Sequence, residues 1–354
     1  MLGHNKISGY LEVKMDYILN QLKHLLAIPS PTGYTSNAAA YIEDELRKLG
    51  YEPSVTNKGG IVVCIGGEGN PLMLSSHVDT LGGMVAEIKG NGRLRMVNIG
   101  GLNPNNAETE NCVVHCRMSG KNYCGTLQMN NASVHVNKDY SKTSREFNQM
   151  EIVLDEKTSS ADETKALGIM TGDFISFDPR TTITESGYIK SRFLDDKLSA
   201  AILLGYAKRV KETERKLARK VYLYFTVYEE VGHGCAGAIP SDIEEIISVD
   251  MGCVGDGLAC TECDVSICVK DSAGPYNYEV TTNLIRCANE NNIGFAADIY
   301  PYYGSDADAA LQAGHELKHG LIGPGVYASH GYERSHKEGV ENTLRLIEAY
   351  TLLK

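Results

Sequence analysis

The sequence predicts an α/β protein with a small β-rich domain inserted into it. Amphipathic helical segments alternate with short apolar runs near both ends of the chain, which is typical of a sheet covered by helices. Between about Gly83 and Glu185 the chain is rich in Gly and Asn and carries short alternating runs. A length of 354 residues also suits two domains.

The N-terminal part begins with two predicted helices followed by two predicted strands. The first helix is expected to stop at Pro29, and the second has Ser36 as its cap and Gly50 as its terminator. Residues 1–14 form an extension without an assigned role. The helices are expected over residues 15–28 and 37–49, and the strands over residues 61–65 and 72–76.

The middle of the chain predicts strands rather than helices. Its alternating apolar and polar residues suggest a half-exposed sheet. We therefore expect a main domain from residues 1–82 and 186–354, with residues 83–185 inserted for dimerisation, assembly and access rather than for chemistry. Three strands are expected at residues 93–97, 133–136 and 151–154.

The C-terminal part returns to the alternation of helices and strands. Apolar runs bounded by turn residues predict buried strands, and apolar residues at helical spacing predict helices between them. The strands are expected at residues 221–228, 246–249 and 265–269, and the helices at residues 198–210, 278–291, 306–313 and 340–353.

Charge and composition exclude several classes of partner. The chain has 34 basic and 45 acidic residues, a net charge of -11, and no concentrated basic face, which argues against nucleic acid and anionic membranes. No signal peptide and no apolar stretch of about 20 residues is visible, so we expect a cytoplasmic protein. Its ten cysteines are expected to be reduced, and the CxxC at Cys260 and Cys263 lacks a second half at zinc-ribbon spacing.

Five short stretches place metal-ligand side chains at or near strand ends. The carboxyl ends of strands in an open α/β sheet are where active sites collect. Each stretch has an ordinary explanation when taken alone, so the prediction depends on their repetition. The residues are His77 with Asp79, Asp195 with Asp196, Glu229 with Glu230, Asp250, and His330 with His336 nearby.

This inventory suits two divalent ions. One ion would be held by His77, Asp195 and Asp250, and the other by Asp195, Glu230 and His330, with Asp195 bridging. Three protein ligands per ion leave a position open for water, as in catalytic sites. The metal is expected to be Zn, with Co or Mn as alternatives, because His and carboxylate ligands accept all three.

Two more acids complete the predicted site. Glu229 would act as the general base that takes a proton from water and passes it to the departing amine. Asp79 lies two positions after His77, and such an acid can hold the second ring nitrogen of a ligand histidine.

In this order the stretches resemble the tetrahedral aminopeptidase family, which includes glutamyl and deblocking aminopeptidases and proteins once labelled endoglucanases. The resemblance covers nearly the whole chain from about Met15. The further shared segments are Ile28–Gly33, Leu94-Arg95, Ile99–Gly101, Gly168-Ile169, Gly172-Asp173, Phe177-Asp178 and Gly304–Ala307.

The resemblance implies the same ligands and base, with Asp79 as the carboxylate behind the first histidine. It also implies a mixed-sheet α/β/α exopeptidase domain with a β-barrel insert, short peptides with a free amino end as substrates, and a homo-oligomeric shell such as a dodecamer. The stretch before His330 lacks the family's usual Arg-Tyr, so His336 competes for the role. We prefer His330 because its distance to the closing helix at residues 341–343 fits better. Val78 and Thr80 also differ from common family choices.

Two other functions remain as alternatives. A related two-metal carboxypeptidase or N-deacylase would use the same ligands, but its inserted domain usually contains clear helices, which residues 84–185 do not show. A non-catalytic shell or binding protein with the same fold is the alternative of another class. The complete ligand set together with Glu229 argues against it, because a relic would tolerate the loss of a ligand.

Overall fold

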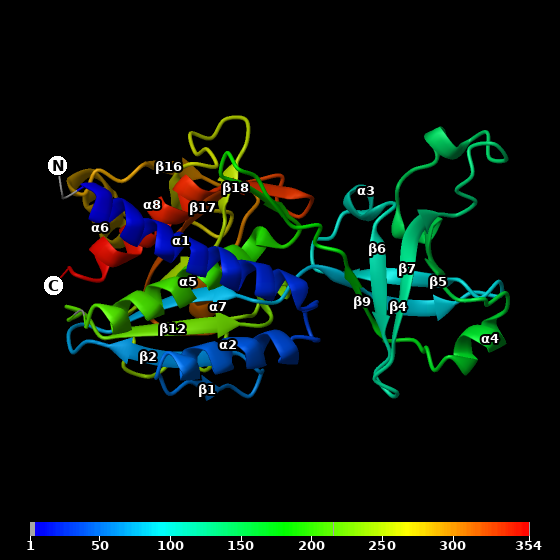
Figure 1. Ribbon diagram of the computed structural model, residues 1–354, viewed down its shortest axis with the longest axis horizontal. Helices are drawn as coiled ribbons and strands as arrows, with labels where there is room; N and C mark the ends of the chain where they lie inside the picture. The colour runs from blue at the N-terminus through cyan, green and yellow to red at the C-terminus, as the bar shows by residue number, and fades with distance from the viewer. Residues whose placement is uncertain (1–3, 215, 354) are drawn as a thin grey trace.

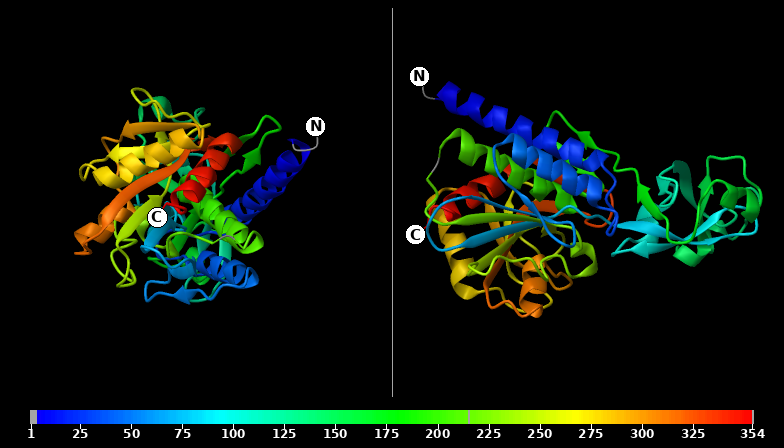
Figure 2. Two further views of the ribbon diagram at one scale, coloured as in Figure 1. Left: turned by 90° about the vertical axis from the view of Figure 1, so that its left-hand side faces the viewer. Right: turned by 90° about the horizontal axis from the view of Figure 1, so that it is seen from below.

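The computed structural model describes residues 4–214 and 216–353, and it shows an α/β body with a β-barrel extending from one end (Figure 1). The body is assembled from the segments before and after the barrel in the sequence. Seen from below, the barrel stands clear of the body and joins it at one end only (Figure 2).

The body is organised around a twelve-stranded mixed sheet. Strands β12, β3, β13 and β17 are parallel neighbours, whereas β2 and β15 pair with this set in the antiparallel direction. Along the main path the strands are β1 (Ser54–Val55), β2 (Ile61–Gly66), β12 (Val221–Thr226), β3 (Leu72–His77), β13 (Glu245–Val249), β17 (Lys318–Tyr327), β18 (Glu333–His336), β11 (Tyr188–Ser191) and β10 (Thr182–Ile183). Off this path lie β14 (Gly252–Val254), β15 (Val265–Lys270) and β16 (Phe295–Ile299).

Alternate residues of the central strands face two separate apolar cores. In β12, Leu223 and Phe225 belong to one core and Tyr224 to the other, and in β3 Leu74 and Met73 divide in the same way. Side chains alternate between the two faces of a strand, so a strand covered on both faces reads as a continuous apolar run. This explains why the predicted strands of the body could be recognised.

Helices cover both faces of the sheet, which confirms the predicted α/β/α architecture. Five helices contribute to the larger core, and α7 packs on the opposite face. Within residues 4–214 and 216–353, no helix combines the length and the apolarity needed to cross a bilayer. The five are α1 (His4–Ala27), α2 (Ser36–Lys48), α5 (Leu194–Glu212), α6 (Tyr278–Glu290) and α8 (Lys337–Tyr350), and α7 is Asp306–Gln312.

The insert forms a closed six-stranded antiparallel barrel, as the resemblance implied. Two short helices, α3 (Pro104–Ala107) and α4 (Ala161–Ala166), lie in its connections. The domain boundaries at residues 83 and 185 stay a prediction. Strand β10 lies inside the predicted insert but pairs with β11 in the sheet of the body. In order around the barrel the strands are β4 (Gly82–Ile88), β5 (Leu94–Ile99), β8 (Met150–Leu154), β7 (Asn122–Met129), β6 (Asn111–His115) and β9 (Phe174–Phe177).

One predicted strand is wrong. Residues 133–136 form turns instead, and the side chains of Val134 and Val136 are exposed. Polar and apolar residues do alternate in this segment, but no neighbouring strand pairs with it in the described structure. Alternation alone does not make a strand, because strands depend on cross-strand partners.

Four helix starts differ from the predicted positions, among them that of α8, which begins at Lys337 rather than at residue 340. Helix α1 begins at His4 rather than at residue 15, so most of the N-terminal extension continues this helix, while residues 1–3 lie outside the described chain. Ser36 is the first residue of α2, and Thr35 occupies the cap without a side-chain hydrogen bond. Helix α5 spans Leu194–Glu212, but Asp195 and Asp196 have non-helical backbone angles, so its regular part begins after them, close to the predicted start at residue 198.

Candidate metal centre

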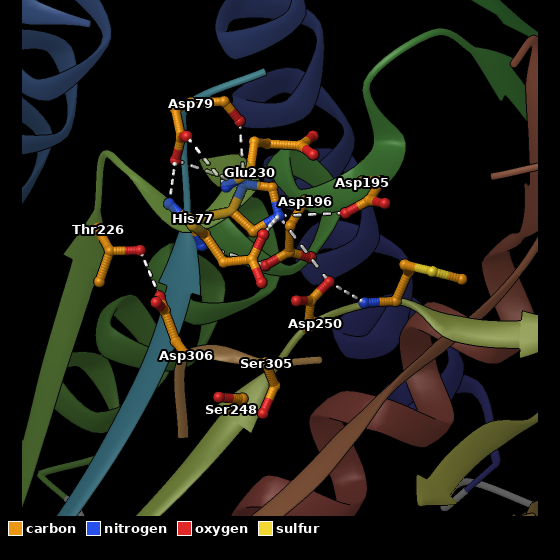
Figure 3. A network of polar contacts seen from close by, with 12 residues as sticks. His77, Asp79, Asp195, Asp196, Thr226, Glu230, Ser248, Asp250, Ser305 and Asp306 are labelled. Atoms are coloured by element: carbon orange, nitrogen blue, oxygen red, sulfur yellow. Dashed lines mark hydrogen bonds and ion pairs between the residues drawn. The ribbon is translucent and has the colours of Figure 1, made fainter. Parts of the chain in front are cut away.

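The predicted ligands converge at the carboxyl edge of the parallel strands. Strand β3 ends at His77, directly beside Thr226 at the end of β12. The chain after β12 continues into a short 3-10 helix (Glu229–Val231), and Asp250 follows the neighbouring strand β13. Because these strands are parallel and in register, their ends deliver side chains to one place. Figure 3 shows the acids gathered around His77.

His77 presents its Nε2 atom to the centre. Its Nδ1 atom donates to the backbone oxygen of Asp79 at 2.9 Å, whereas the Asp79 carboxylate lies 3.7 Å away. The expected orienting contact is therefore made by the carbonyl rather than by the acid. The Asp79 carboxylate instead accepts the backbone N–H groups of Glu229 and Glu230 at 3.2 and 3.3 Å, and the hydroxyl of Thr32 at 2.6 Å. Asp79 thus fixes the backbone that carries the two glutamates.

Asp195 faces both histidines with different oxygens. Its Oδ1 lies 3.1 Å from His77 Nε2, and its Oδ2 lies 3.5 Å from His330 Nε2. Glu230 Oε2 is 3.6 Å from the same His330 atom. Burial alone would raise the pKa of Asp195, but the hydrogen bonds and charges of the two histidines lower it. A carboxylate shared by two metal sites is expected to have one oxygen near each histidine, as Asp195 has.

Glu229 and Asp250 lie on the His77 side of the centre. Glu229 Oε2 is 3.7 Å and Asp250 Oδ1 is 4.0 Å from His77 Nε2. Among the described residues, three groups of three bring ligand atoms within 4.8 Å of one another. Two lie in this centre, His77 with Glu229 and Asp250 and His77 with Asp195 and Glu230, and the third is Cys263 with His336 and Glu338.

His336 lies elsewhere, and its ring has other partners. Its Nδ1 atom accepts the backbone N–H of Glu338 at 3.1 Å, which caps α8, and its Nε2 atom donates to the carbonyl of Ser186 at 2.9 Å. Both ring nitrogens are therefore engaged in holding the start of α8. His330, by contrast, lines the pocket at the strand ends together with Asp195 and Glu230.

The centre holds more acids than basic groups. Burial lowers the pKa of His77 and of His330, but the neighbouring carboxylates raise both more strongly, that of His330 to about 10, so these two imidazoles are the positive partners of the acids. Burial and the neighbouring Asp195 raise the pKa of Glu230 to about 8 and that of Asp250 to about 7. Burial also raises the pKa of Glu229 well above its usual range. No Lys or Arg is found among the described residues that line this pocket. Lys197, close by in the sequence, gives its ammonium to the carbonyls of Leu25 and Ile28 instead.

These residues fit a divalent metal. Buried carboxylates need a positive partner or a proton, and a bound cation is often the largest charge in such a site. Oxygen and imidazole ligands of this kind suit Zn, Co or Mn. The donor groups of this chain are therefore consistent with a metal site.

Three buried acids near the centre were not assigned roles from the sequence. Glu333 accepts the backbone N–H groups of Asp195 and His330, and Asp196 accepts that of His77. Asp306 accepts the hydroxyl of Thr226 and the backbone N–H of Cys235. Their functions depend on contacts between distant segments, and the only available signal was the position of Asp196, Glu333 and Asp306 inside recognised stretches.

An open pocket of about 370 Å³ lies over the centre. One wall comes from the metal-type residues, and the other comes from helix α7 and from the loops around residues 272–273 and 302–305. A pocket of this size can hold an amino-acid side chain or a short peptide end. The other wall contains Ser272, Ala273, Tyr302, Tyr303, Gly304, Ser305, Asp306, Asp308, Ala309 and Gln312.

Residues 59–346 match the model of the M42 glutamyl aminopeptidase family. YhfE of Bacillus subtilis (strain 168), provisionally named an aminopeptidase, is 46% identical over 331 residues, which cover 93% of this chain and 95% of that protein. The glutamyl aminopeptidase of Lactococcus lactis is 26% identical over 61% of this chain and 60% of its own length.

The fold is also similar to solved structures. The TET1 peptidase of Pyrococcus horikoshii, described as able to assemble into a tetrahedron or a large octahedral shell, matches with a TM-score of 0.84 and 21% identity, over 95% of this chain and 100% of that one. The family resemblance and the class of enzyme predicted from the sequence are thereby confirmed. The chain belongs to the M42 glutamyl aminopeptidase family of peptide hydrolases.

Proposed function

We propose that the chain is a two-metal aminopeptidase that removes the N-terminal residue from short peptides. The observation that carries this proposal is the cluster of carboxylates around two imidazoles, with no Lys or Arg in the described pocket lining. In the proposal, His77 and Asp250 hold one ion, Glu230 and His330 hold the other, and Asp195 bridges them. Zinc is the proposed metal, with cobalt or manganese as alternatives.

Glu229 is the proposed general base. When bound, divalent ions polarise the scissile carbonyl and make a water more acidic. Glu229 lines the pocket, and its side chain lies at the same His77 nitrogen as Asp195. In the proposed reaction its carboxylate takes the proton of the attacking water and delivers it to the departing amine. Asp79, through the backbone N–H of Glu229, keeps this carboxylate in place.

The charge of the pocket favours a free amino end over a free carboxyl end. A carboxypeptidase must bind the terminal carboxylate of its substrate, usually with Arg or Lys. The described lining contains neither residue, whereas several acids can attract an ammonium group. This supports the aminopeptidase over the two-metal carboxypeptidase. The complete set of acids and imidazoles also argues against a non-catalytic protein.

The second wall indicates which N-terminal side chains fit. Asp306 and Asp308 line it, and Asp308 is further enclosed by the hydroxyls of Tyr276 and Ser305. With acids and no described cation in the wall, a glutamyl or aspartyl side chain would meet like charge. We propose that neutral and basic N-terminal residues are preferred.

Assembly into a homo-oligomer is a further part of the proposal. The support comes from the exposed apolar side chains Met118, Val134 and Val136 of the barrel region. Solvent-exposed apolar groups of this size are typical of surfaces that pair with another copy when they gather on one patch. A dodecamer is one candidate, since a structural relative is described as a dodecamer.

A panel of aminoacyl reporter amides tests the reaction. We expect the metal-loaded protein to cleave amides with a free amino group and to leave the same amides with a blocked amino group intact. Each substrate would be assayed with Zn, Co and Mn, and with Glu229→Gln as the matched inactive control. Cleavage of the blocked amides alone would favour the N-deacylase, and no cleavage of any amide or peptide would favour the non-catalytic alternative.

A further inference from the structure

His330 has an unusual backbone conformation for a residue that must aim its ring. Its φ angle is +61°, in the left-handed region, and the neighbouring Ala328 has a φ angle of +59°. Residues with a Cβ atom rarely adopt this conformation without support from their surroundings. The His330 side chain is also 40% exposed, so burial alone does not hold it. Specific contacts must therefore keep the ring in place.

One set of contacts comes from the body. Glu333 accepts the backbone N–H of His330 at 3.0 Å with one oxygen and the backbone N–H of Asp195 at 3.1 Å with the other. A single buried carboxylate thus joins the backbones of two proposed ligands. Its effect is to fix the distance between the segments that carry Asp195 and His330.

The second set of contacts comes from the barrel. Asn106 donates its Nδ2 hydrogen to the carbonyl of His330 at 3.1 Å, and the carbonyl of Gly101 lies 3.3 Å from His330 Nδ1. A hydrogen on Nδ1 that points to Gly101 leaves the lone pair on Nε2, which faces Asp195 and Glu230. The barrel therefore sets both the backbone and the ring of this histidine.

The barrel segment itself is well anchored and closely fitted. Asn106 lies in α3, whose first turn is capped by the side chain of Asn103, and the following Ala107 is buried in the core. A Cβ atom on Gly101 would lie 2.6 Å from His330 Nδ1, so only glycine fits beside the ring. A fixed segment in such close contact can position the ring.

We propose that Asn106 and Gly101 of the barrel are positioning residues for His330, so that the barrel helps to build the metal position shared by Asp195, Glu230 and His330. The inference rests on the proposed function for the role of His330 as a ligand. It goes beyond the expectation that the insert serves assembly and access alone, because it gives the insert a part in metal binding.

Metal titration of Asn106→Ala tests the proposal without relying on activity. Loss of an outer contact to a ligand weakens metal binding by about 10- to 100-fold. Calorimetric titration of the metal-free full-length protein with Zn should show one ion bound as in the wild type and the other weakened to this extent. Asn137→Ala is the matched control, because Asn137 also donates its amide to a barrel carbonyl, that of Asn131, at 3.0 Å. This control should bind both ions normally.

A second pair of variants separates positioning from general damage. Asn106→Ala should have no further effect on metal binding in a His330→Ala background, because the ring it positions is gone. Gly101→Ala should weaken the same ion, since its methyl group displaces the ring. Circular dichroism and thermal unfolding should match those of Asn137→Ala.

Two results distinguish the failures. If the wild type binds two ions and Asn106→Ala binds both with unchanged affinity, the inference is overturned while the proposed function stands. If the wild type binds no divalent ion, the proposed function fails first, and the role of the barrel in metal binding falls with it.

Discussion

The barrel and the carboxyl edge of the sheet both bury acids, but they treat them differently. In the barrel, Glu151 contacts Lys89 and Arg93. At the sheet edge, Glu230 and Asp250 are equally enclosed, and no Lys or Arg is present among the described residues that line their pocket. The chain supplies Lys and Arg as counter-charge in the barrel, whereas the acids of the sheet edge outnumber their basic partners, the imidazoles of His77 and His330.

This difference indicates that the acids at the sheet edge, unlike those of the barrel, need a bound ion. An unpaired buried charge is costly, so a stable fold either pairs it, protonates it or binds an ion. The raised pKa of Glu230, about 8, is the direct consequence of burial and of the neighbouring Asp195. A cluster that pays this cost in stability is better explained by a bound cation than by packing.

The largest effect is expected for Glu229, because we propose that it transfers the proton and does not bind metal. Glu229→Gln keeps the shape of the side chain but cannot take a proton. We expect kcat to fall by about two to four orders of magnitude with both ions retained, as measured by steady-state kinetics and elemental analysis. Glu52→Gln, an exposed glutamate between α2 and β1, serves as the control. Near-normal turnover of Glu229→Gln would remove it as the base.

Replacing one glutamate by glutamine in each region tests the comparison between the sheet edge and the barrel. Glu230→Gln should lose one ion, because an amide is a poor ligand for the proposed metals. Glu151→Gln should retain both ions but unfold at lower temperature, because it leaves Lys89 and Arg93 without their shared partner. Metal counts by elemental analysis and melting curves report the two effects. A full metal count in Glu230→Gln would exclude it from the ligand set.

A smaller effect is expected from the charge of the second wall. Burial raises the pKa of Asp308 to about 7, so the test is made at a higher pH, where this carboxylate is ionised. A glutamyl side chain would then be repelled by about 2 kcal/mol at a distance of roughly 8 Å and an effective dielectric constant near 20. The kcat/KM value for a glutamyl reporter should therefore be about 10- to 30-fold below that for the glutamine analogue. Equal values for the two amides would show that the wall does not select against acids.

The smallest effect is expected in the stability of the metal-free protein. The carboxyl groups of Glu230 and Asp250 have raised pKa values in the fold, about 8 and 7, and ordinary values in the unfolded chain. Between pH 5 and 8 the folded state binds more protons, so its stability falls as the pH rises. We expect the melting temperature without metal to drop by a few degrees over this range. Added Zn should restore most of the loss, and a rise in stability with pH would contradict the assignment.

Much of the body could be predicted because its strands are covered on both faces. The strands Leu72–His77 and Val221–Thr226 are mostly apolar, and ligand-type residues stand at the end of the first, His77, and shortly after the second, Glu229, so one pattern gave both the strand and the candidate site. The barrel was harder, since its strands are half exposed. The segment at residues 133–136 shows that alternation without a partner strand is not enough.

The remaining parts of the site depend on contacts between distant segments. Asn106 meets His330 across 224 positions of sequence, and Glu333 meets Asp195 across 138. No local pattern marks such residues, because their roles arise only when the barrel and the sheet come together. The same is true of Ser272 and Tyr302 in the second wall, whose loops could not be placed from the sequence.

The central claim is that the acids and the two histidines at the sheet edge hold the ions on which peptide hydrolysis depends. The most direct measurement follows cleavage of a leucyl reporter amide while Zn is added to protein stripped of metal by a chelator, with bound metal counted at each step. We predict no turnover without metal and a plateau in activity at two ions bound per chain. Full turnover in protein that elemental analysis finds free of metal would contradict the account.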